Sequence, residues 1–280
     1  MAIVVSEIGA RALAAVAASG GTARVLAPLT RSIYLTAGDE IVWLASESSG
    51  HARAMVAPLP DPPPAPGAVV RVAAEHARRW RPAALPAALA SATALAAGAR
   101  TIVARITELG TADGFGAAVA GRQPAFPLDG AMNVARALAM ACAADDPEAA
   151  VRAALPLLGL GPGLTPAGDD YVGSAFFART VLRSAGGSTA DGWGRAAAVV
   201  ATAARQRTHP ISAALLGDLV AGDAYGPLHD LACALAAGTS ALEPARRLTR
   251  LGHSSGWDLL AGFLGALTGR LAPSDVVGVQ

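Results

Sequence analysis

The sequence predicts an α+β protein, with a mostly antiparallel β domain at residues 1–127 and a mainly α-helical domain at residues 128–280. Short apolar runs with alternation, separated by turn residues, fill the first part. From Leu128 onward the apolar residues recur with helical spacing, and Gly and Pro fall only at junctions. A hydrophobic content of 53% with only 15% charged residues excludes disorder for most of the 280 residues.

In the first domain, a short Ala-rich helix is expected over Ser6–Ala18. Strands follow it, bounded by turn signals, at Thr22–Leu35, Ile41–Leu44, Ala54–Leu59 and Val69–Val72. Pro58–Pro66 is typical of a surface loop. A helix over Ala83–Gly98 and two further strands, Thr101–Ile106 and Phe115–Val119, are expected before Pro124 and Pro127 end the domain.

The second domain is predicted to be a succession of helices. They are expected at Gly130–Ala144, Pro147–Leu158, Gly168–Ala185, Trp193–Ala204, Ile211–Val220, Pro227–Ala236, Leu242–Leu251 and Ser255–Leu271. This domain also carries the Gly-rich segments that could hold a ligand.

Composition excludes several classes of function. With 22 basic and 21 acidic residues, the net charge of +1 argues against a nucleic-acid or membrane-surface partner. Every basic residue is arginine, which excludes lysine Schiff bases and a P-loop lysine. No strongly apolar stretch of about 20 residues predicts a membrane span, and Glu7 interrupts the N-terminal apolar run. We therefore expect a cytoplasmic protein, and the high hydropathy favours a well-buried oligomer.

The isolated cysteine and histidine residues suggest no chemistry of their own. One disulfide between Cys142 and Cys233 is arithmetically allowed, but two buried free thiols are favoured in a cytosolic protein. His51 and His76 are expected at the surface.

The first Gly-rich segment, Gly159–Asp170, precedes a predicted helix. Gly159, Gly161 and Gly163, three glycines within five residues, permit backbone conformations that other residues avoid. Gly161, Gly163 and Gly168 are the glycines expected to bind the anion. Thr165 is expected to cap the helix, with Pro166 as its first residue. Such a loop can turn several N–H groups toward one anion at the positive end of the helix. The alternative is a tight helix–helix connection whose glycines only allow close packing.

Two adjacent acids, Asp169 and Asp170, lie in the first turn of that helix. One acid would suffice to complement the helix dipole. A pair beside a glycine-rich loop also suits Mg²⁺, which would bridge the acids and a bound anion.

A second helix start follows Arg205 and Arg207. Thr208 or His209 is expected to cap it, with Pro210 as the first helical residue. The planar guanidinium group of an arginine can donate two parallel hydrogen bonds to the oxygens of a carboxylate or a phosphate. Solvated arginines and a simple capping histidine are the alternative.

The third helix start combines hydroxyls, a histidine and glycines. Ser254 or Ser255 can cap the helix. The other hydroxyl and backbone N–H groups, with Gly256 among the candidate residues, would then face a ligand. His253 could move a proton near neutral pH, although a packed histidine is the alternative. No serine hydrolase is predicted, because the nucleophile-elbow spacing is missing. If the three helix starts converge, they would form a polar pocket for a small, oxygen-rich anion.

The segments Leu158–Asp170, Ser212–Leu216 and Gly252–Asp258 resemble the blocks of the AllH-like family, in the same order. The resemblance covers the helical half and implies a relation to oxamate carbamoyltransferase, an assembly of dissimilar subunits in allantoin degradation. That reaction interconverts oxalurate plus phosphate with oxamate plus carbamoyl phosphate. The resemblance supplies no catalytic residues.

Roles are therefore assigned from the chemistry of the side chains. His253, Asp169 and Asp170 are the catalytic candidates, and the acid pair is the candidate Mg²⁺ site. Phosphate would suit the Gly-rich loop and the serines, and a carboxylate would suit Arg205 or Arg207. Two alternatives remain open: a non-catalytic binding or assembly subunit, and a divalent-metal-dependent hydrolase.

Overall fold

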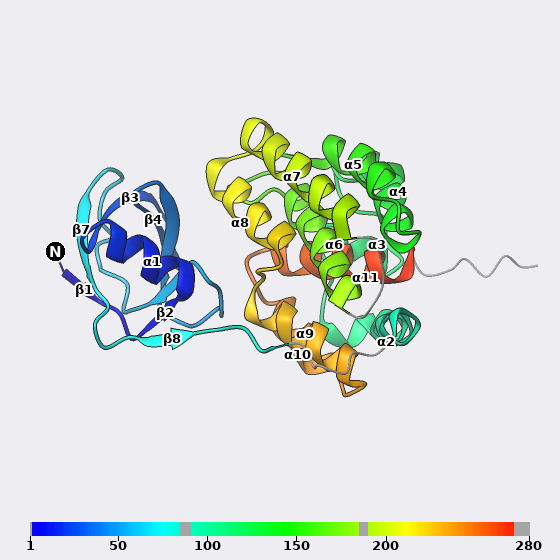
Figure 1. Ribbon diagram of the computed structural model, residues 1–280, viewed down its shortest axis with the longest axis horizontal. Helices are drawn as coiled ribbons and strands as arrows, with labels where there is room; N and C mark the ends of the chain where they lie inside the picture. The colour runs from blue at the N-terminus through cyan, green and yellow to red at the C-terminus, as the bar shows by residue number, and fades with distance from the viewer. Residues whose placement is uncertain (1, 85–90, 185–189, 272–280) are drawn as a thin grey trace, which may run out of the picture. The chain divides into compact units, whose positions relative to one another are not determined.

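The computed structural model describes residues 2–84, 91–184 and 190–271, and the chain divides into two compact units. Unit 1 is Met1–Ala83 and unit 2 is Ala84–Gln280. The predicted α+β class is confirmed, because unit 1 holds the β-sheet and unit 2 is helical (Figure 1). The division falls between Ala83 and Ala84, whereas the sequence analysis set the end of the β domain near residue 127.

Within the described residues, unit 1 forms one mixed sheet of eight strands, ordered β1-β7-β3-β4-β5-β6-β2-β8. The strands are β1 (Ala2–Val4), β2 (Glu7–Gly9), β3 (Thr22–Pro28), β4 (Ser32–Ala37), β5 (Glu40–Ala45), β6 (Ala54–Val56), β7 (Val69–Ala73) and β8 (Arg78–Trp80). The pairs β1–β7, β2–β8 and β5–β6 are parallel, and the other four described pairs are antiparallel. The strands β1, β2 and β8, each three residues long, were not predicted. The predicted helix over Ser6–Ala18 is wrong in its first part, because Glu7–Gly9 is β2 and α1 begins at Ala10.

Residues 2–9 curl this sheet by joining two of its distant strands. Only Val5 and Ser6 separate β1 from β2, although the two strands lie far apart in the sheet order. The Val5 N–H donates to Ala73 O (3.0 Å), and the Ser6 N–H donates to Val56 O (2.8 Å). One short segment therefore connects a strand at one end of the sheet order with a strand near the other end.

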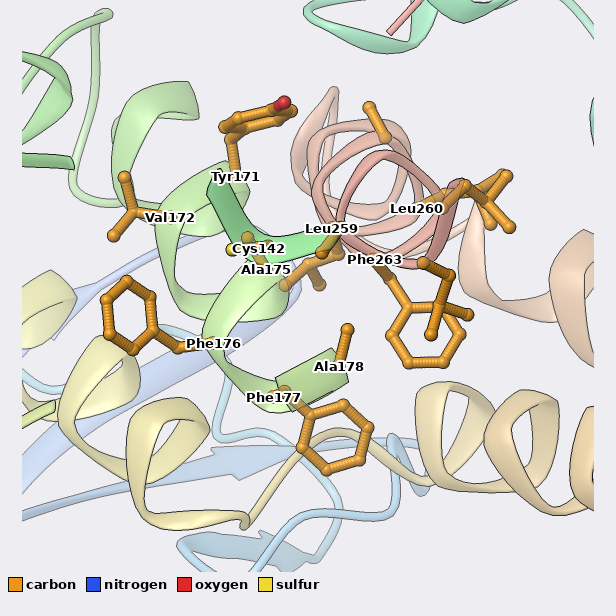
Figure 2. Packing of buried hydrophobic residues seen from close by; sticks show 14 of the residues in the cluster. Cys142, Tyr171, Val172, Ala175, Phe176, Phe177, Ala178, Leu259, Leu260 and Phe263 are labelled. Carbon is orange, nitrogen blue, oxygen red and sulfur yellow. The ribbon is translucent and has the colours of Figure 1, made fainter. Parts of the chain in front are cut away.

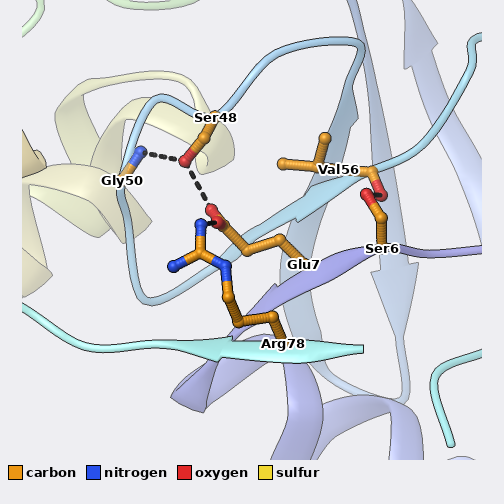
Figure 3. Close-up of polar contacts among 6 residues, drawn as sticks. All are labelled: Ser6, Glu7, Ser48, Gly50, Val56 and Arg78. Carbon is orange, nitrogen blue, oxygen red and sulfur yellow. Dashed lines mark hydrogen bonds and ion pairs between the residues drawn. The ribbon is translucent and has the colours of Figure 1, made fainter. Parts of the chain in front are cut away.

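A helix and a buried acid complete unit 1. Helix α1 (Ala10–Ala18) buries Ala12, Ala15 and Val16 in the same core as the strands. Glu7 is 6% exposed, and its carboxylate accepts hydrogen bonds from Ser48 and from the Arg78 guanidinium (Figure 3). This contact ties β2 to β8 and to the loop after β5. His51 is 1% exposed, so its prediction as a surface residue is wrong, whereas His76 is exposed as predicted.

Unit 2 is built from helices whose predicted positions are largely confirmed. They are α2 (Ala92–Ala104), α3 (Gly116–Val119), α4 (Met132–Ala143), α5 (Pro147–Ala154), α6 (Ala167–Ser184), α7 (Ala190–Arg207), α8 (Pro210–Ala221), α9 (Gly226–Ala237), α10 (Leu242–Leu248) and α11 (Ser255–Thr268). The 3₁₀ turns Ile106–Leu109, Asp129–Ala131 and Leu155–Leu157 connect some of them.

Two predicted strands in this region are wrong. Thr101–Ala104 is the end of α2, and Gly116–Val119 is α3. Leu95, Ala99 and Ile102 are buried at helical spacing, so packing on one face outweighs the β preference of the Thr-Ile-Val run. The predicted helix over Ala83–Gly98 overlaps α2 only in its last part, and residues 85–90 lie outside the described residues.

Helices α6 and α11 form the centre of unit 2. Both bury nearly every residue. Figure 2 shows aromatic side chains of the two helices in one cluster, where the rings of Phe177 and Phe263 are 6.0 Å apart. A Cβ on Gly262 would lie 2.1 Å from Tyr171 O, so glycine is required where the helices touch. This close crossing holds the first turns of α6 and α11 in fixed positions.

Both cysteines are free thiols. Cys142 is buried, and burial raises the pKa of its thiol to about 12, whereas Cys233 is only half-buried. The preference for free thiols over a disulfide is therefore confirmed. No helix in the described parts of the chain combines the length and apolar character needed to cross a membrane.

Candidate functional site

The three helix starts singled out in the sequence are brought together by side chains of the first one. They precede α6, α8 and α11 respectively. The contacts run through Asp169 on one side and through Thr165 and Asp170 on the other. The three segments, residues 159–170, 208–212 and 253–258, thus converge in unit 2 and are called the loop junction below.

Asp169 joins the first segment to the second. Its side chain is 1% exposed. Oδ1 accepts the Gly159 N–H (2.8 Å), and Oδ2 accepts the hydroxyls of Thr208 and Ser212, the latter at 2.7 Å. Both oxygens are therefore satisfied by the protein, as a buried carboxylate requires. Asp169 fixes the Gly-rich loop against the start of α8.

The third segment meets the first through hydroxyl groups. The Thr165 and Ser255 hydroxyl oxygens lie 3.2 Å apart and are half-buried. The predicted capping role of Thr165 differs from its observed contact, because α6 begins at Ala167 and the hydroxyl is directed to Ser255. Two hydroxyls from helix starts 90 residues apart therefore share one location.

Asp170 and Asp258 are the buried acids of the loop junction. Asp170 is 4% exposed in the first turn of α6, and Asp258 is 0% exposed in the first turn of α11. The Phe115 N–H donates to Asp258 Oδ1 (2.7 Å), so the loop before α3 also reaches this place. A Cβ on Gly114 would lie 2.1 Å from the same oxygen, which leaves glycine as the residue that fits there.

Burial changes the protonation of both acids. Loss of solvation raises the pKa of Asp258 to about 7, against hydrogen bonds from the Phe115 N–H and the Ser254 hydroxyl that lower it. Loss of solvation also raises the pKa of Asp170 well above its ordinary value, and the nearby charge of Asp258 raises it further. Hydrogen bonding from Ser255 acts in the opposite direction on Asp170. The carboxyl group of Asp258 is thus close enough to act on that of Asp170.

The Gly-rich loop leaves backbone donors available. Gly159, Gly161 and Gly163 adopt φ values of 77°, 116° and 89°, in the region that favours glycine. Among the described residues, the N–H groups of Gly161, Gly163, Leu164 and Thr165 donate to no protein acceptor. Half-exposed N–H groups in such a loop can bind anion oxygens.

Close packing explains part of the glycine pattern. A Cβ on Gly168 would lie 2.0 Å from Leu157 O, and one on Gly256 would lie 2.0 Å from Leu248 O. At Gly163 a Cβ would meet nothing within 4 Å, so only its φ favours glycine. The alternative interpretation as a tight connection therefore accounts for Gly168 and Gly256, and it does not account for Gly163.

The remaining predicted residues are exposed or contact other groups outside the buried acids of the loop junction. His209 caps α8, since its Nδ1 accepts the Ile211 N–H (3.2 Å), and Pro210 is the first helical residue as predicted. Arg205 and Arg207 are exposed, and Arg207 donates to Leu155 O (2.8 Å). His253 is 94% exposed, with its Nδ1 3.3 Å from Asp113 Oδ2. Ser254 occupies the N-cap position of α11, but its hydroxyl makes no capping hydrogen bond.

Sequence reasoning missed Ser212 and Asp258 as members of the loop junction. Both follow directly after the helix starts that it identified. An acid in the first turn of an otherwise apolar helix is a signal that could have found Asp258. The contribution of Phe115 is made by a backbone group and carries no such signal.

The loop junction offers carboxylates, hydroxyls and backbone N–H donors to a ligand. In the described residues, no group of three or more His, Cys, Asp or Glu side chains is placed to hold a metal ion. The predicted catalytic and Mg²⁺ roles of Asp169 and Asp170 stay predictions.

One comparison with known proteins bears on this site. Residues 157–267 match the family model described as oxamate carbamoyltransferase subunit AllH. The predicted resemblance to AllH is thereby confirmed over this segment. The AllH match begins at Leu157, just before the Gly-rich loop, and ends near the end of α11, so it contains all three segments of the loop junction. Phe115, whose backbone binds Asp258, precedes the matched region. No curated protein and no solved structure matches the chain at a significant level.

Proposed function

We propose that this chain is a subunit of, or an enzyme related to, oxamate carbamoyltransferase, and that its loop junction binds a small oxygen-rich anion. The single observation that carries the proposal is the convergence of three helix starts inside the AllH-matched region. The anion is carbamoyl phosphate, phosphate or an oxamate-like carboxylate.

The chemistry of the loop junction suits such an anion. The unengaged N–H groups of Gly161, Gly163, Leu164 and Thr165 and the hydroxyls of Thr165 and Ser255 are donors to phosphate oxygens. The first turns of α6, α8 and α11 add the positive ends of three helix dipoles. The raised pKa values of Asp170 and Asp258 reduce the negative charge near the anion at neutral pH.

The reacting groups are assigned on the same chemistry. Attack on a carbamoyl carbon develops negative charge on its oxygen, which the loop N–H groups or His253 would stabilise. Arg205 or Arg207 would bind a substrate carboxylate through a planar fork. Asp169, Asp170 and His253 are the catalytic candidates, and the contacts of Asp169 favour a positioning role.

The assembly is part of the proposal. The matched family is named for a subunit, which supports dissimilar partner subunits for this chain. We propose that it acts in the cytoplasm within an oligomer. Turnover by the purified chain alone would identify it as the catalytic subunit, whereas turnover only after addition of partners would identify it as one component.

A ligand titration tests the anion site. The melting temperature of the purified chain is measured against carbamoyl phosphate, phosphate and oxamate in the presence of a chelator. Binding to the folded state raises the melting temperature with ligand concentration. The variant Ser255→Ala removes one donor to the anion, and the loss of about 1.5 kcal/mol predicts roughly tenfold weaker binding.

Thr268→Ala is the matched control, because it removes a hydroxyl from the other end of α11. It should leave the anion response unchanged. Equal responses in wild type and Ser255→Ala, or no response to any of the three anions, would reject the proposed site.

A further inference from the structure

Two buried carboxyl oxygens in unit 2 have no hydrogen-bond partner among the described residues: Oδ2 of Asp170 and Oδ2 of Asp258. Both side chains are more than nine-tenths buried. Buried polar atoms nearly always have a hydrogen-bond partner, and a bound ion is one of the few explanations for an exception. The two unpartnered oxygens therefore indicate that a ligand binds there.

The two acids lie in one place rather than in separate pockets. They occupy the first turns of the tightly packed helices α6 and α11, whose starts meet where the Thr165 and Ser255 hydroxyl oxygens lie 3.2 Å apart. The charge of Asp258 also acts on Asp170. The charged groups acting on them are Asp169 and Asp113, both acidic. No arginine is among the groups that shift either pKa. A bound cation would stabilise the charged carboxylates, in competition with the protons that burial favours.

We propose that Asp170 and Asp258 together bind a divalent cation of the Mg²⁺ class through their Oδ2 atoms. Mg²⁺ is usually held in proteins by one or two carboxylates, with water or substrate oxygens completing the six ligands. Two carboxylates therefore suffice, although they form no cluster of three. The Ser255 hydroxyl, which hydrogen-bonds Asp170, is a further oxygen at the same place.

The proposed cation site uses a different acid pair from the one expected from the sequence. Asp169 neighbours Asp170 in the chain, but its oxygens are engaged by Gly159, Thr208 and Ser212. Asp258 comes from another helix and keeps one oxygen available. The cation site goes beyond the proposed anion site and does not depend on it.

The test uses the full chain, freed of metal by a chelator and exchanged into phosphate-free buffer. Melting temperature is measured against MnCl₂ and MgCl₂ in the absence of any anionic substrate. Electron paramagnetic resonance counts bound Mn²⁺ through the loss of the free-ion signal. We expect a melting temperature that rises with the logarithm of metal concentration and one bound Mn²⁺ per chain.

Asp258→Asn and Asp170→Asn should each remove both responses. Asn keeps the shape of the side chain, and at position 258 it keeps an acceptor for the Phe115 N–H. Asp146→Asn is the matched control, since it neutralises an exposed N-cap acid of α5 with a residue that caps equally well. It should bind Mn²⁺ like the wild type.

The proposal is overturned if wild type binds no Mn²⁺ and melts at the same temperature with and without metal. The pair would then hold a proton in place of a metal. It is also overturned if either Asn variant keeps the wild-type response. Should one variant fail to fold, the other variant and the wild-type Mn²⁺ count decide the result. Because the anion titration is run with chelator, failure of one site is distinguishable from failure of the other.

Discussion

Asp169 shows how one side chain can hold a site together. It accepts hydrogen bonds from a loop N–H and from two hydroxyls of another helix start, all in a buried setting. Hydrogen bonds to a charged group contribute about 1.5–3 kcal/mol each, and partners left unsatisfied add their own cost. A loss of turnover in a variant at this position would therefore not identify a catalytic role by itself.

We predict that Asp169→Ala lowers the free energy of unfolding by about 3 kcal/mol, because three donors lose their acceptor. Urea denaturation followed by circular dichroism measures this change. The control is Asp230→Ala, which breaks the partly exposed ion pair with Arg247 (2.9 Å) and should cost at most about 1 kcal/mol. Equal stabilities of the two variants would contradict the positioning role of Asp169.

His229 is a second residue whose environment fixes its chemistry. It is 7% exposed, its Nε2 accepts the Ala224 N–H (3.0 Å), and its ring meets Phe177 edge-on. Burial lowers the pKa of the imidazole, against Asp223 and Asp230, which raise it. The folded state therefore favours the neutral ring more than the unfolded state does.

The sign of the resulting pH dependence follows from that difference. The stabilisation is complete above the unfolded pKa of about 6.5 and is lost as pH falls toward the lower folded pKa. We predict that the urea midpoint of the wild type falls more between pH 7 and pH 5.5 than that of His229→Gln. Gln supplies an acceptor that does not titrate in this range. Parallel pH profiles of the two proteins would refute the assignment.

At the scale of elements, the crossing of α6 and α11 depends on a missing side chain. Gly262 allows α11 to approach the backbone of Tyr171 and the hydroxyl of Ser174. Alanine is the better helix former, but its Cβ would lie 2.3 Å from that hydroxyl oxygen. Packing and helix propensity therefore act in opposite directions here.

We predict that Gly262→Ala lowers stability by about 1–3 kcal/mol through overpacking. Gly194→Ala is the matched comparison, because a Cβ at this exposed position of α7 would meet nothing within 4 Å. It should raise stability by about 0.8 kcal/mol through helix propensity alone. Chemical denaturation of the two variants checks both signs, and a stabilised Gly262→Ala would disprove the close crossing.

The elements that could be predicted from the sequence are those with strong local signals. The helices from Met132 onward have apolar periodicity and Pro or Gly at their ends, and their predicted positions agree with the structure. The short strands β1, β2 and β8 have no alternation to detect, because they exist through pairing with distant strands. Thr101–Ala104 carries a β-type local signal that tertiary packing overrides.

At the scale of the whole molecule, each unit has a hydrophobic core of its own. We predict that residues 84–280, expressed alone, retain a helical circular dichroism spectrum and a cooperative melt. A core that includes α6 and α11 lies within this part, so folding does not require the sheet. A fragment that is unfolded or melts without cooperativity would show that the two units depend on each other.

The convergence of the candidate site could be predicted only in part. Gly, hydroxyl and acid residues at three helix starts indicated a common location, and the contacts of Asp169 and Thr165 bring those segments together. That Asp258 acts on Asp170 could not be inferred, because the packing of α6 and α11 brings together helix starts that lie far apart in the chain. The backbone donor of Phe115 has no side-chain signature at all.

The two-residue link between β1 and β2 has a consequence for how the protein should be handled. Residues 2–9 act as a clasp, covering Ala73 on β7 and Val56 on β6 with backbone hydrogen bonds. Cutting or deleting the clasp would uncover strand edges on both sides at once, and bare edges invite other chains to pair with them. Deletion of residues 2–9 should therefore make the protein self-associate. Size-exclusion chromatography would show this as material that elutes earlier than the intact protein.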